Sequence, residues 1–310
     1  MTPSSKTIAI TVTFNPDFAT LKKQLESLKY QCRVIIVDNG SERDLLVPIK
    51  EYIASNDHIK LIALNDNIGI SRAQNVGIEE VIKSYPEAEF VLLLDHDSLP
   101  GARMVEDLTS EFQTVADRGI PIAAIGPLLF DPRDKKYLGF HKICCFFYKK
   151  IIPQKNSQPL ECHSLNSSGS LITLDALKNV GLLEQDFFMD HGETEWCFRA
   201  TFKGYKIFGT SKVVMEHLMG DEVCEYWFFG RKRMPYRSPL RHYYIVRNSL
   251  FMQKRSYIPL TWKLWNFVKI LSTYIYFGFF SKESASHRKF INRGISDGFK
   301  GVTGKIAEAS

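Results

Sequence analysis

Two phosphate-binding motifs that are common in α/β enzymes are missing from this sequence. No G-x-G-x-x-G follows the first apolar segment, which disfavours a dinucleotide-binding Rossmann enzyme, and the absence of G-x-x-x-x-G-K-[ST] disfavours a P-loop NTPase. The six cysteines form no C-x-x-C pair, so we expect reduced thiols in a cytoplasmic protein. No common zinc-site spacing is found in the set Cys144, Cys145, Cys162 and His163. No charged segment precedes a long apolar one at the N-terminus, so no signal peptide is predicted.

The composition is that of a folded protein. The 310 residues are 45% hydrophobic and 24% charged, which allows one large domain or two small ones. The net charge of +6 is uneven, because basic residues strongly outnumber acidic ones after residue 203 and the preceding part is net acidic. A basic C-terminal part indicates an anionic partner. Nucleic acid, phosphate and a membrane surface are the alternatives.

Apolar segments alternate with helix-spaced segments through the first 94 residues. Strands are predicted at residues 7–14, 33–37, 59–64 and 90–94, with helices at 18–30, 45–53 and 70–84 between them. This alternation predicts an α/β fold with a parallel sheet of right-handed βαβ units. Further on we expect a strand at 122–130, an insertion or hairpin at 131–153, a turn and strand at 165–174, a helix at 175–181 and a strand at 212–217.

The segment that organises the chain is the apolar run at residues 90–94, which is followed by Asp95 and Asp97. An unbroken apolar run of this length is typical of a strand that is buried on both faces. The two carboxylates follow its C-terminal end, the edge where open α/β sheets bind ligands, and could converge on one divalent cation. A polar turn without ligand is the alternative interpretation.

Other polar residues are expected at the same edge, each with a structural alternative. Asp38 follows the second strand and could hydrogen-bond a ribose or base, or cap the next helix. His217 ends a strand and could complete a metal site, or be structural. The arginine-rich residues 231–247 suit a diphosphate or form a basic surface loop.

Three acids lie among aromatic residues at positions 187–196: Asp190, Glu193 and Glu195. An acidic cluster shielded in this way is where the pKa of a carboxylate can rise enough to serve as a base. Acids favoured by the dipole of a helix N-terminus are the alternative.

The C-terminal part is aromatic and basic. Residues 258–280 contain Lys263 and Lys269, which make a membrane span improbable on charge grounds. Two interpretations stay open: a helix at a bilayer interface, or a helix pair packed on the core. The lysines and arginines of residues 281–310 favour anionic lipid.

Eight motifs occur in a fixed order along residues 7–250. They are T-F-N-P, V-D-N-G-S, N-x-N-x-G-I-S-x-A-x-N-x-G-I, L-L-L-D-H-D-S, N-S-S-G-S-L-I, D-x-x-x-T-E-W-C-x-R, H-x-x-G-D and R-H-Y-Y-I-V-R-N-S. This set resembles the inverting GT-A-fold glycosyltransferases of the family 2 type. Within them it resembles the bacterial dTDP-rhamnose-dependent rhamnosyltransferases of O-antigen and lipopolysaccharide biosynthesis.

The resemblance implies a GT-A fold, with a mostly parallel central sheet, flanking helices and a C-terminal helical extension. The catalytic domain would span residues 1–255. Residues 256–310 would form an aromatic and basic helical extension, for which membrane association and packing on the core both stay open. The implied reaction is Mg²⁺- or Mn²⁺-dependent transfer of L-rhamnose from dTDP-L-rhamnose to a polyprenyl-diphosphate-linked saccharide. It would occur at the inner face of the cytoplasmic membrane, on an anionic surface and without nucleic acid.

The resemblance also implies roles for single residues. Glu193, where many relatives have Asp, would be the catalytic base, and either Asp190 or Glu195 could share this role. The metal ligands would be Asp95, Asp97 and His217. The donor nucleotide would contact Thr13, Phe14, Asn15, Asp38, Asn67, Gly69, Arg72, Asn75 and Asp95. The diphosphate or the acceptor would contact Ser168, Gly169, Trp196, Arg247 and Asn248.

Three other functions are weighed against this one. The same site with a UDP-sugar donor is the first. A sugar nucleotidyltransferase is the second, but it would need a glycine- and arginine-rich segment where this chain has Asn15-Pro16-Asp17. A non-catalytic domain that docks on membranes is the third, and it has no need of the acid cluster at residues 190–195.

Overall fold

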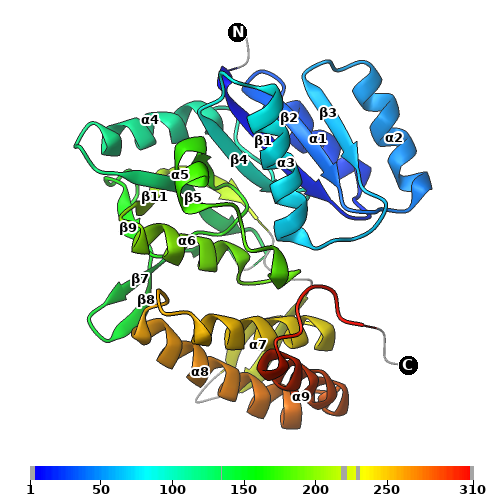
Figure 1. Ribbon diagram of the computed structural model, residues 1–310, viewed down its shortest axis with the longest axis vertical. Coiled ribbons are helices and arrows are strands. Elements are labelled where there is room, and N and C mark those ends of the chain that lie inside the picture. Colours follow the sequence, from blue (N-terminus) through cyan, green and yellow to red (C-terminus); the bar gives the residue numbers. More distant parts are fainter. Residues whose placement is uncertain (1–3, 134, 218–221, 228–230, 308–310) are drawn as a thin grey trace.

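A mixed sheet forms the centre of the molecule in the computed structural model, which describes residues 4–133, 135–217, 222–227 and 231–307 (Figure 1). Within these residues the sheet has nine strands. Along the sheet they are ordered β3 (Ile59–Ala63), β2 (Cys32–Asp38), β1 (Ser4–Thr13), β4 (Phe90–Asp95), β10 (Leu171–Thr173), β5 (Ile122–Asp131), β11 (Lys206–Glu216) and β9 (Leu160–Cys162), and β6 (Lys136–Leu138) pairs with β5.

The strand directions explain how one edge of the sheet collects polar residues. The first four strands are parallel to one another, as are β5 and β11, whereas β10 runs antiparallel between β4 and β5. In this register Thr13 lies beside Asp38, and Val12 lies beside Asp95. The predicted α/β fold with a mostly parallel sheet is confirmed.

Helices cover both faces of the sheet. One core joins it to α1 (Phe18–Leu28), α2 (Arg43–Ala54) and α4 (Met104–Ala116). The other joins it to α3 (Ile70–Ser84), α5 (Leu174–Val180) and α6 (Gly192–Phe202). Helical spacing explains the packing of α1, because Leu21, Leu25 and Leu28 lie on one face of the helix and are fully buried.

A separate helical layer follows, below the sheet in Figure 1. It consists of α7 (Pro239–Lys254), α8 (Leu260–Ile275), the π-helical turn η2 (Tyr276–Phe280) and α9 (Ser284–Lys300). The layer is joined to α6 through a buried cluster that includes Phe198, Met252 and Trp262. The C-terminal helical extension is thus confirmed, and its predicted boundary at residue 255, which falls between α7 and α8, stays a prediction. None of the helices in the described ranges is long and apolar enough to cross a membrane.

Two small antiparallel ribbons complete the chain. The predicted insertion contains a hairpin of β7 (Phe140–Cys144) and β8 (Phe147–Ile151), and β12 (Glu222–Trp227) pairs with β13 (Arg231–Tyr236). A short 3₁₀ turn, η1 (Gln185–Phe187), precedes α6. The strand predicted at 212–217 is the end of a longer one, because β11 begins at Lys206 and its pairing with β5 shifts between Thr210 and Val214.

Candidate active site

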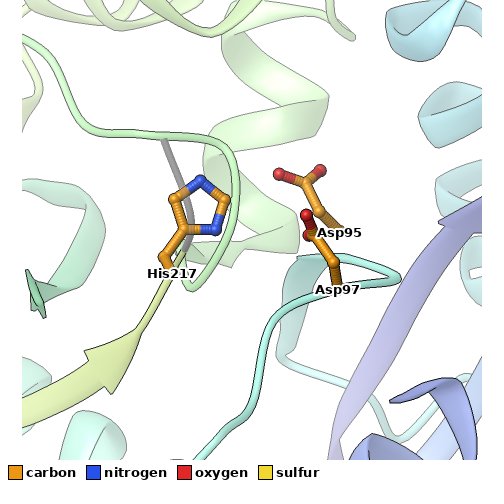
Figure 2. A group of neighbouring side chains, drawn as sticks. All are labelled: Asp95, Asp97 and His217. Carbon is orange, nitrogen blue, oxygen red and sulfur yellow. The ribbon is translucent and has the colours of Figure 1, made fainter. Parts of the chain in front are cut away.

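Two acids and a histidine meet at the C-terminal edge of the sheet. Asp95 ends β4, Asp97 lies in the turn that follows, and His217 comes directly after β11. One ligand atom from each lies within 4.8 Å of the others (Figure 2). A bridge between Leu99 and Glu216 draws the turn after β4 to the end of β11, which explains why residues so far apart in sequence converge.

Buried hydroxyl groups hold this group in place. Ser98 Oγ lies 3.1 Å from His217 Nδ1 and 2.5 Å from Ser168 Oγ, and Ser168 Oγ accepts a hydrogen bond from the backbone N–H of Asp95. Hydrogen bonding at one ring nitrogen fixes the orientation of the imidazole, as is usual for histidines that bind metals. Ser98 therefore belongs to the site, although only its neighbours were predicted.

Gln24 on α1 is a second residue of the site that sequence analysis missed. Its side-chain amide donates to the backbone carbonyls of Asp95 and Ser98, at 2.7 Å each, and its Oε1 accepts from Thr11 Oγ1 at 2.9 Å. Gln24 is buried, so these bonds fix the turn that carries the two acids. A glutamine on the buried face of a helix is the only signal in the sequence.

The donor set fits a divalent cation such as Mg²⁺ or Mn²⁺. Burial raises the pKa of Asp95, and the charge of Asp97 raises it further, whereas His217 lowers it. A bound cation would offset this repulsion between the two carboxylates. Two oxygens and one nitrogen leave coordination positions open for other ligands. The motif residues Gly220 and Asp221 lie outside the described residues.

The neighbouring edge, at the ends of β1 and β2, is closed by hydrogen bonds. Asp38 is fully buried and accepts from Thr13 Oγ1 at 2.8 Å and from the backbone N–H and Oγ of Ser41. Asn15 has a φ of 45°, and its backbone N–H donates to Ser41 Oγ at 2.7 Å. The side chain of Phe14, beside them, is 44% exposed. Asp38 thus has a local structural role whatever it contacts in a complex.

The segment before α3 joins this edge to the acidic loop, which precedes α6 and contains Asp190. Asn67 Oδ1 accepts from the Asn39 side chain and from the backbone N–H of Gly69, at 3.0 Å each. Gly69 has a φ of +91°, and a Cβ there would lie 2.5 Å from the carbonyl oxygen of Phe188. Arg72 on α3 is exposed. Asn67, Gly69 and Arg72 thus lie between the ends of β1 and β2 and the loop before α6.

Asn75, which was predicted to contact the donor nucleotide, is hydrogen-bonded within the protein. Its side chain is buried, donates to the carbonyl of Leu183 at 2.9 Å and accepts from the backbone N–H of the same residue at 3.0 Å. Both polar ends of the amide are used in joining α3 to the loop before α6. Asn75 thus has a structural role, and its predicted contact with the nucleotide stays a prediction.

The acidic loop before α6 has an unusual backbone. Phe188, Asp190 and His191 all have positive φ values, of 40°, 61° and 69°. Such conformations cost energy and persist only where the surroundings impose them, most often at functional sites. Helix α7 imposes this one: the Asn248 side chain donates to the carbonyls of Phe187, Met189 and Asp190, and Ser249 Oγ lies 3.0 Å from His191 Nε2.

The two acids of the loop that face the site differ in charge environment. Asp190 pairs with Arg241 at 3.1 Å and Arg237 at 3.4 Å, and these arginines hold its pKa below the usual value against the effect of burial. Glu193 is half-buried in the first turn of α6, and burial raises its pKa to about 7, with the charges of Asp190 and Asp95 adding to the rise. Glu193 is thus the carboxylate suited to proton transfer near neutral pH.

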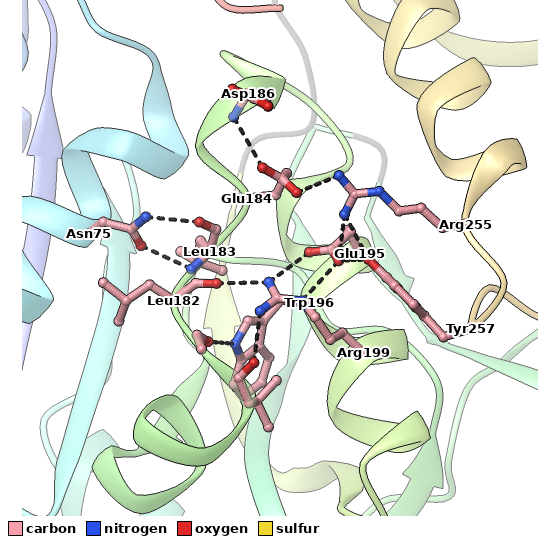
Figure 3. A network of polar contacts seen from close by, with 12 residues as sticks. Asn75, Leu182, Leu183, Glu184, Asp186, Glu195, Trp196, Arg199, Arg255 and Tyr257 are labelled. Carbon is pink, nitrogen blue, oxygen red and sulfur yellow. Dashed lines mark hydrogen bonds and ion pairs between the residues drawn. The ribbon is translucent and has the colours of Figure 1, made fainter. Parts of the chain in front are cut away.

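Glu195, the third acid, is a structural residue. It is fully buried, and its carboxylate pairs with Arg199 at 2.9 Å and Arg255 at 2.8 Å and accepts from the Tyr257 hydroxyl (Figure 3). Arg255 also pairs with Glu184. With all of its acceptor positions directed into this network, Glu195 does not share the role of Glu193.

Replacing Glu195 with alanine is expected to lower the free energy of unfolding by about 3–5 kcal/mol, because Arg255 and Arg199 would lose a buried partner. Urea denaturation followed by circular dichroism measures this difference. Glu193→Gln, as the matched control on the same helix turn, should change stability by less than about 1 kcal/mol. Equal stability of Glu195→Ala and wild type would contradict the structural role.

Three further residues that were predicted to contact a ligand are buried and hydrogen-bonded within the protein. The Trp196 side chain is buried and donates to the carbonyl of Gly181 at 2.8 Å. Arg247 is fully buried and donates to Asn248 Oδ1 and to the carbonyls of Asp186 and Gly304. The Asn248 side chain donates to carbonyls of the acidic loop, as described above. Their side chains donate hydrogen bonds within the protein, and their predicted contacts with a diphosphate or an acceptor stay predictions.

A cavity of about 600 Å³ opens beside Glu193. Asp190, Glu193 and Ser168 line it, together with residues of α8 and of the β7–β8 hairpin. Gly169 is next to it, with a φ of +88° and its backbone N–H bonded to the carbonyl of Leu93. The cavity is large enough for one or two sugar units.

Solved structures of other proteins share this fold. S. aureus TarS 1-349 in complex with UDP-GlcNAc matches with a TM-score of 0.57 at 16% identity, over 96% of this chain and 81% of that one. The mannosyltransferase PcManGT from Pyrobaculum calidifontis, in complex with GDP-Man and Mn²⁺, matches with a TM-score of 0.55 at 13% identity, over 96% and 77%. The fold is that of the GT-A glycosyltransferases.

Sequence comparison gives the family. A model described as glycosyl transferase family 2 matches residues 8–152. An N-acetylglucosaminyltransferase from Bradyrhizobium elkanii is 34% identical over 131 residues, which are 40% of this chain and 67% of that protein. The dTDP-rhamnosyl transferase RfbF from Shigella flexneri is 28% identical over 306 residues, 97% of this chain and 98% of that protein. This chain belongs to glycosyl transferase family 2, and the predicted glycosyltransferase activity is confirmed.

Proposed function

We propose that the enzyme transfers L-rhamnose from dTDP-L-rhamnose to a lipid-linked saccharide in O-antigen assembly. The similarity to dTDP-rhamnosyl transferase RfbF carries this proposal, because it extends over 97% of this chain, including the C-terminal helices. The similarity to the N-acetylglucosaminyltransferase covers only 40%. A UDP-sugar donor is the second candidate, and it would use the same fold.

In the proposed mechanism the carboxylate of Glu193 accepts the proton of an acceptor hydroxyl as that oxygen attacks the anomeric carbon of the donor sugar. The bond from this carbon to the nucleoside diphosphate breaks in the same step, so the configuration inverts. Asp95, Asp97 and His217 would hold Mg²⁺ or Mn²⁺, which when bound offsets the charge on the leaving diphosphate. Asp190 keeps Arg241 and Arg237 beside the loop, and its charge helps to raise the pKa of Glu193.

The donor nucleotide is proposed to lie along the ends of β1, β2 and α3. The exposed Phe14 ring and the exposed Arg72 guanidinium are available for a base and a phosphate. The remaining donor-side positions are expected to shape this edge: Thr13, Asn15, Asp38, Asn67 and Gly69.

Calorimetric titration with dTDP-L-rhamnose and a set of UDP-sugars, each with Mn²⁺, tests the proposed donor. The proposal expects measurable binding of dTDP-L-rhamnose in preference to the UDP-sugars. Preference for a UDP-sugar would retain the fold and the base but discard the rhamnosyl assignment.

A membrane surface is proposed to present the acceptor. One face of α8 carries large apolar side chains that are exposed to solvent: Leu260, Leu264, Phe267, Val268, Leu271 and Ile275. At about 100° per residue they lie within a stripe roughly 100° wide, which is typical of a helix at a bilayer interface. Basic residues outnumber Glu283 and Asp297 between residues 260 and 300: Lys263, Lys269, Lys282, Arg288, Lys289, Arg293 and Lys300. The apolar face and the charge together fit anionic lipid at the inner face of the cytoplasmic membrane.

The double variant Phe267→Ser, Leu271→Ser is expected to bind phosphatidylglycerol vesicles roughly tenfold or more weakly than wild type, because two large apolar side chains no longer enter the interface. Sedimentation with vesicles measures the affinity. Phe202→Ser is the matched control, since Phe202 is as exposed as Phe267, at 69% against 63%, but lies on α6. Equal effects of the control and the double variant would contradict docking through α8.

A further inference from the structure

Helix α8 has two nearly opposite faces with different surroundings. The stripe of exposed apolar side chains on α8 is on one side, and the residues that wall the cavity beside Glu193 are nearly opposite on the helix: Trp262, Trp265, Asn266, Lys269 and Thr273. The cavity therefore lies between the proposed base and the helix proposed to meet the membrane. A group that enters it from a lipid carrier would contact α8.

Asn266 on this wall has an unmet hydrogen-bonding group. Its side chain is only 6% exposed and lines the cavity, and its Oδ1 has no hydrogen-bond partner among the described residues. Buried polar groups in folded proteins are nearly always paired, because an unpaired one loses its bonds to water without replacement. Oδ1 itself has less than 1 Å² of accessible surface, so the amide must turn toward the cavity before a ligand can donate a hydrogen bond to this carbonyl.

The aromatic residues beside Asn266 are held rigidly. Trp265 Nε1 donates to the carbonyl of Phe146 at 3.1 Å, and its ring packs on Phe147 of the hairpin, with centroids 6.3 Å apart. Trp262 makes an edge contact with His191 of the acidic loop, at 5.7 Å between centroids. Fixed indole rings next to an amide oxygen suit a sugar, whose C–H faces pack on aromatic rings while its hydroxyls donate hydrogen bonds.

We propose that the α8 wall is the subsite for the acceptor saccharide, where Asn266 Oδ1 accepts a hydrogen bond from a hydroxyl of the acceptor sugar and the ring of Trp265 packs against that sugar. Asn266 then selects the acceptor and the orientation in which its reacting hydroxyl meets Glu193. This inference rests on the proposed transfer to a saccharide and adds the residues that recognise it.

Asn266→Leu tests the subsite, because leucine has nearly the same volume and no hydrogen-bonding group. The acceptor probe is the lipid extract of a strain deleted for this gene, and initial rates are measured against the amount of extract. The expected result is an acceptor KM at least tenfold higher, with unchanged calorimetric donor affinity and a Tm that is not lowered. Asn266→Asp, which keeps an acceptor oxygen, should recover part of the loss. Ser272→Ala, an exposed position on α8, is the matched control and should behave as wild type.

A wild-type acceptor KM for Asn266→Leu would overturn the proposal. A lowered Tm with parallel loss of donor affinity would also overturn it, because Asn266 would then be a structural residue. Failure of the donor assignment looks different: wild type would not transfer from dTDP-L-rhamnose at all. The Asn266 variants would then be compared with the donor that calorimetry selects, and the same KM criterion would apply.

Discussion

Glu193→Gln is expected to lower kcat by about 10²–10⁴-fold, the usual contribution of a general base, and to leave donor affinity nearly unchanged. Glutamine keeps the size of the side chain but cannot accept the proton of the acceptor hydroxyl. The variant should therefore bind the donor at the edge of the sheet and fail in the chemical step. Single-turnover kinetics with labelled donor, together with calorimetry, separate the two effects.

The pH dependence of wild type provides a second measure of the same role. Because burial raises the pKa of Glu193 to about 7, the residue loses its basic form as the pH falls through that value. Activity should therefore rise with pH up to about 7 and fall below it, and this ascending limb should be absent from the residual rate of Glu193→Gln. Glu51→Gln, on the exposed surface of α2, is the control and should match wild type. Lost donor affinity with appreciable turnover in Glu193→Gln would contradict the assignment.

Asp97→Ala and His217→Ala are each expected to weaken metal-dependent donor binding by at least about 10–100-fold, because each removes one member of the group of three. Calorimetry is carried out with Mn²⁺ and again with EDTA, so that the metal-dependent part is obtained by difference. Wild type should lose most of its donor affinity in EDTA. The variants should bind weakly under both conditions.

The control for these variants is Asp57→Ala, an exposed acid in the turn before β3. It should keep the full difference between Mn²⁺ and EDTA. Donor binding by wild type that is equal with and without metal would contradict a metal site at Asp95, Asp97 and His217. Metal dependence that survives in His217→Ala would remove that residue from the ligand set.

The alternation of apolar and helix-spaced segments predicted the first half of the fold because β1, β2 and β4 are mostly buried on both faces and each helix has one apolar face. Further on, strand β11 was predicted too short. Its first half contains Gly209, whose missing side chain makes room for the ring of Phe140, and a pairing shift follows at Thr210. Neither a close contact nor a bulge leaves a periodic pattern in the sequence.

The candidate site was predicted in part for a similar reason. Asp95, Asp97 and His217 could be proposed because strand ends of a parallel sheet meet at one edge. The buried hydrogen bonds behind them depend on tertiary packing: Gln24 holds the turn after β4, and Asn248 holds the loop before α6. Arg247 and Trp196 lie in motifs whose residue types suit ligands, yet burial directs their donors at main-chain carbonyls. Which way a side chain points inside a motif is decided by contacts that the motif does not contain.

The product of one reaction tests most directly whether the enzyme transfers rhamnose with inversion and with a metal ion. Wild-type enzyme is incubated with dTDP-L-rhamnose, Mn²⁺ and the lipid extract of the deletion strain, and the anomeric configuration of the new glycosidic bond is determined by NMR. We expect a rhamnosyl product with the configuration opposite to that of the donor, formed only with metal. A product that retains the donor configuration, or that forms equally in EDTA, would contradict it.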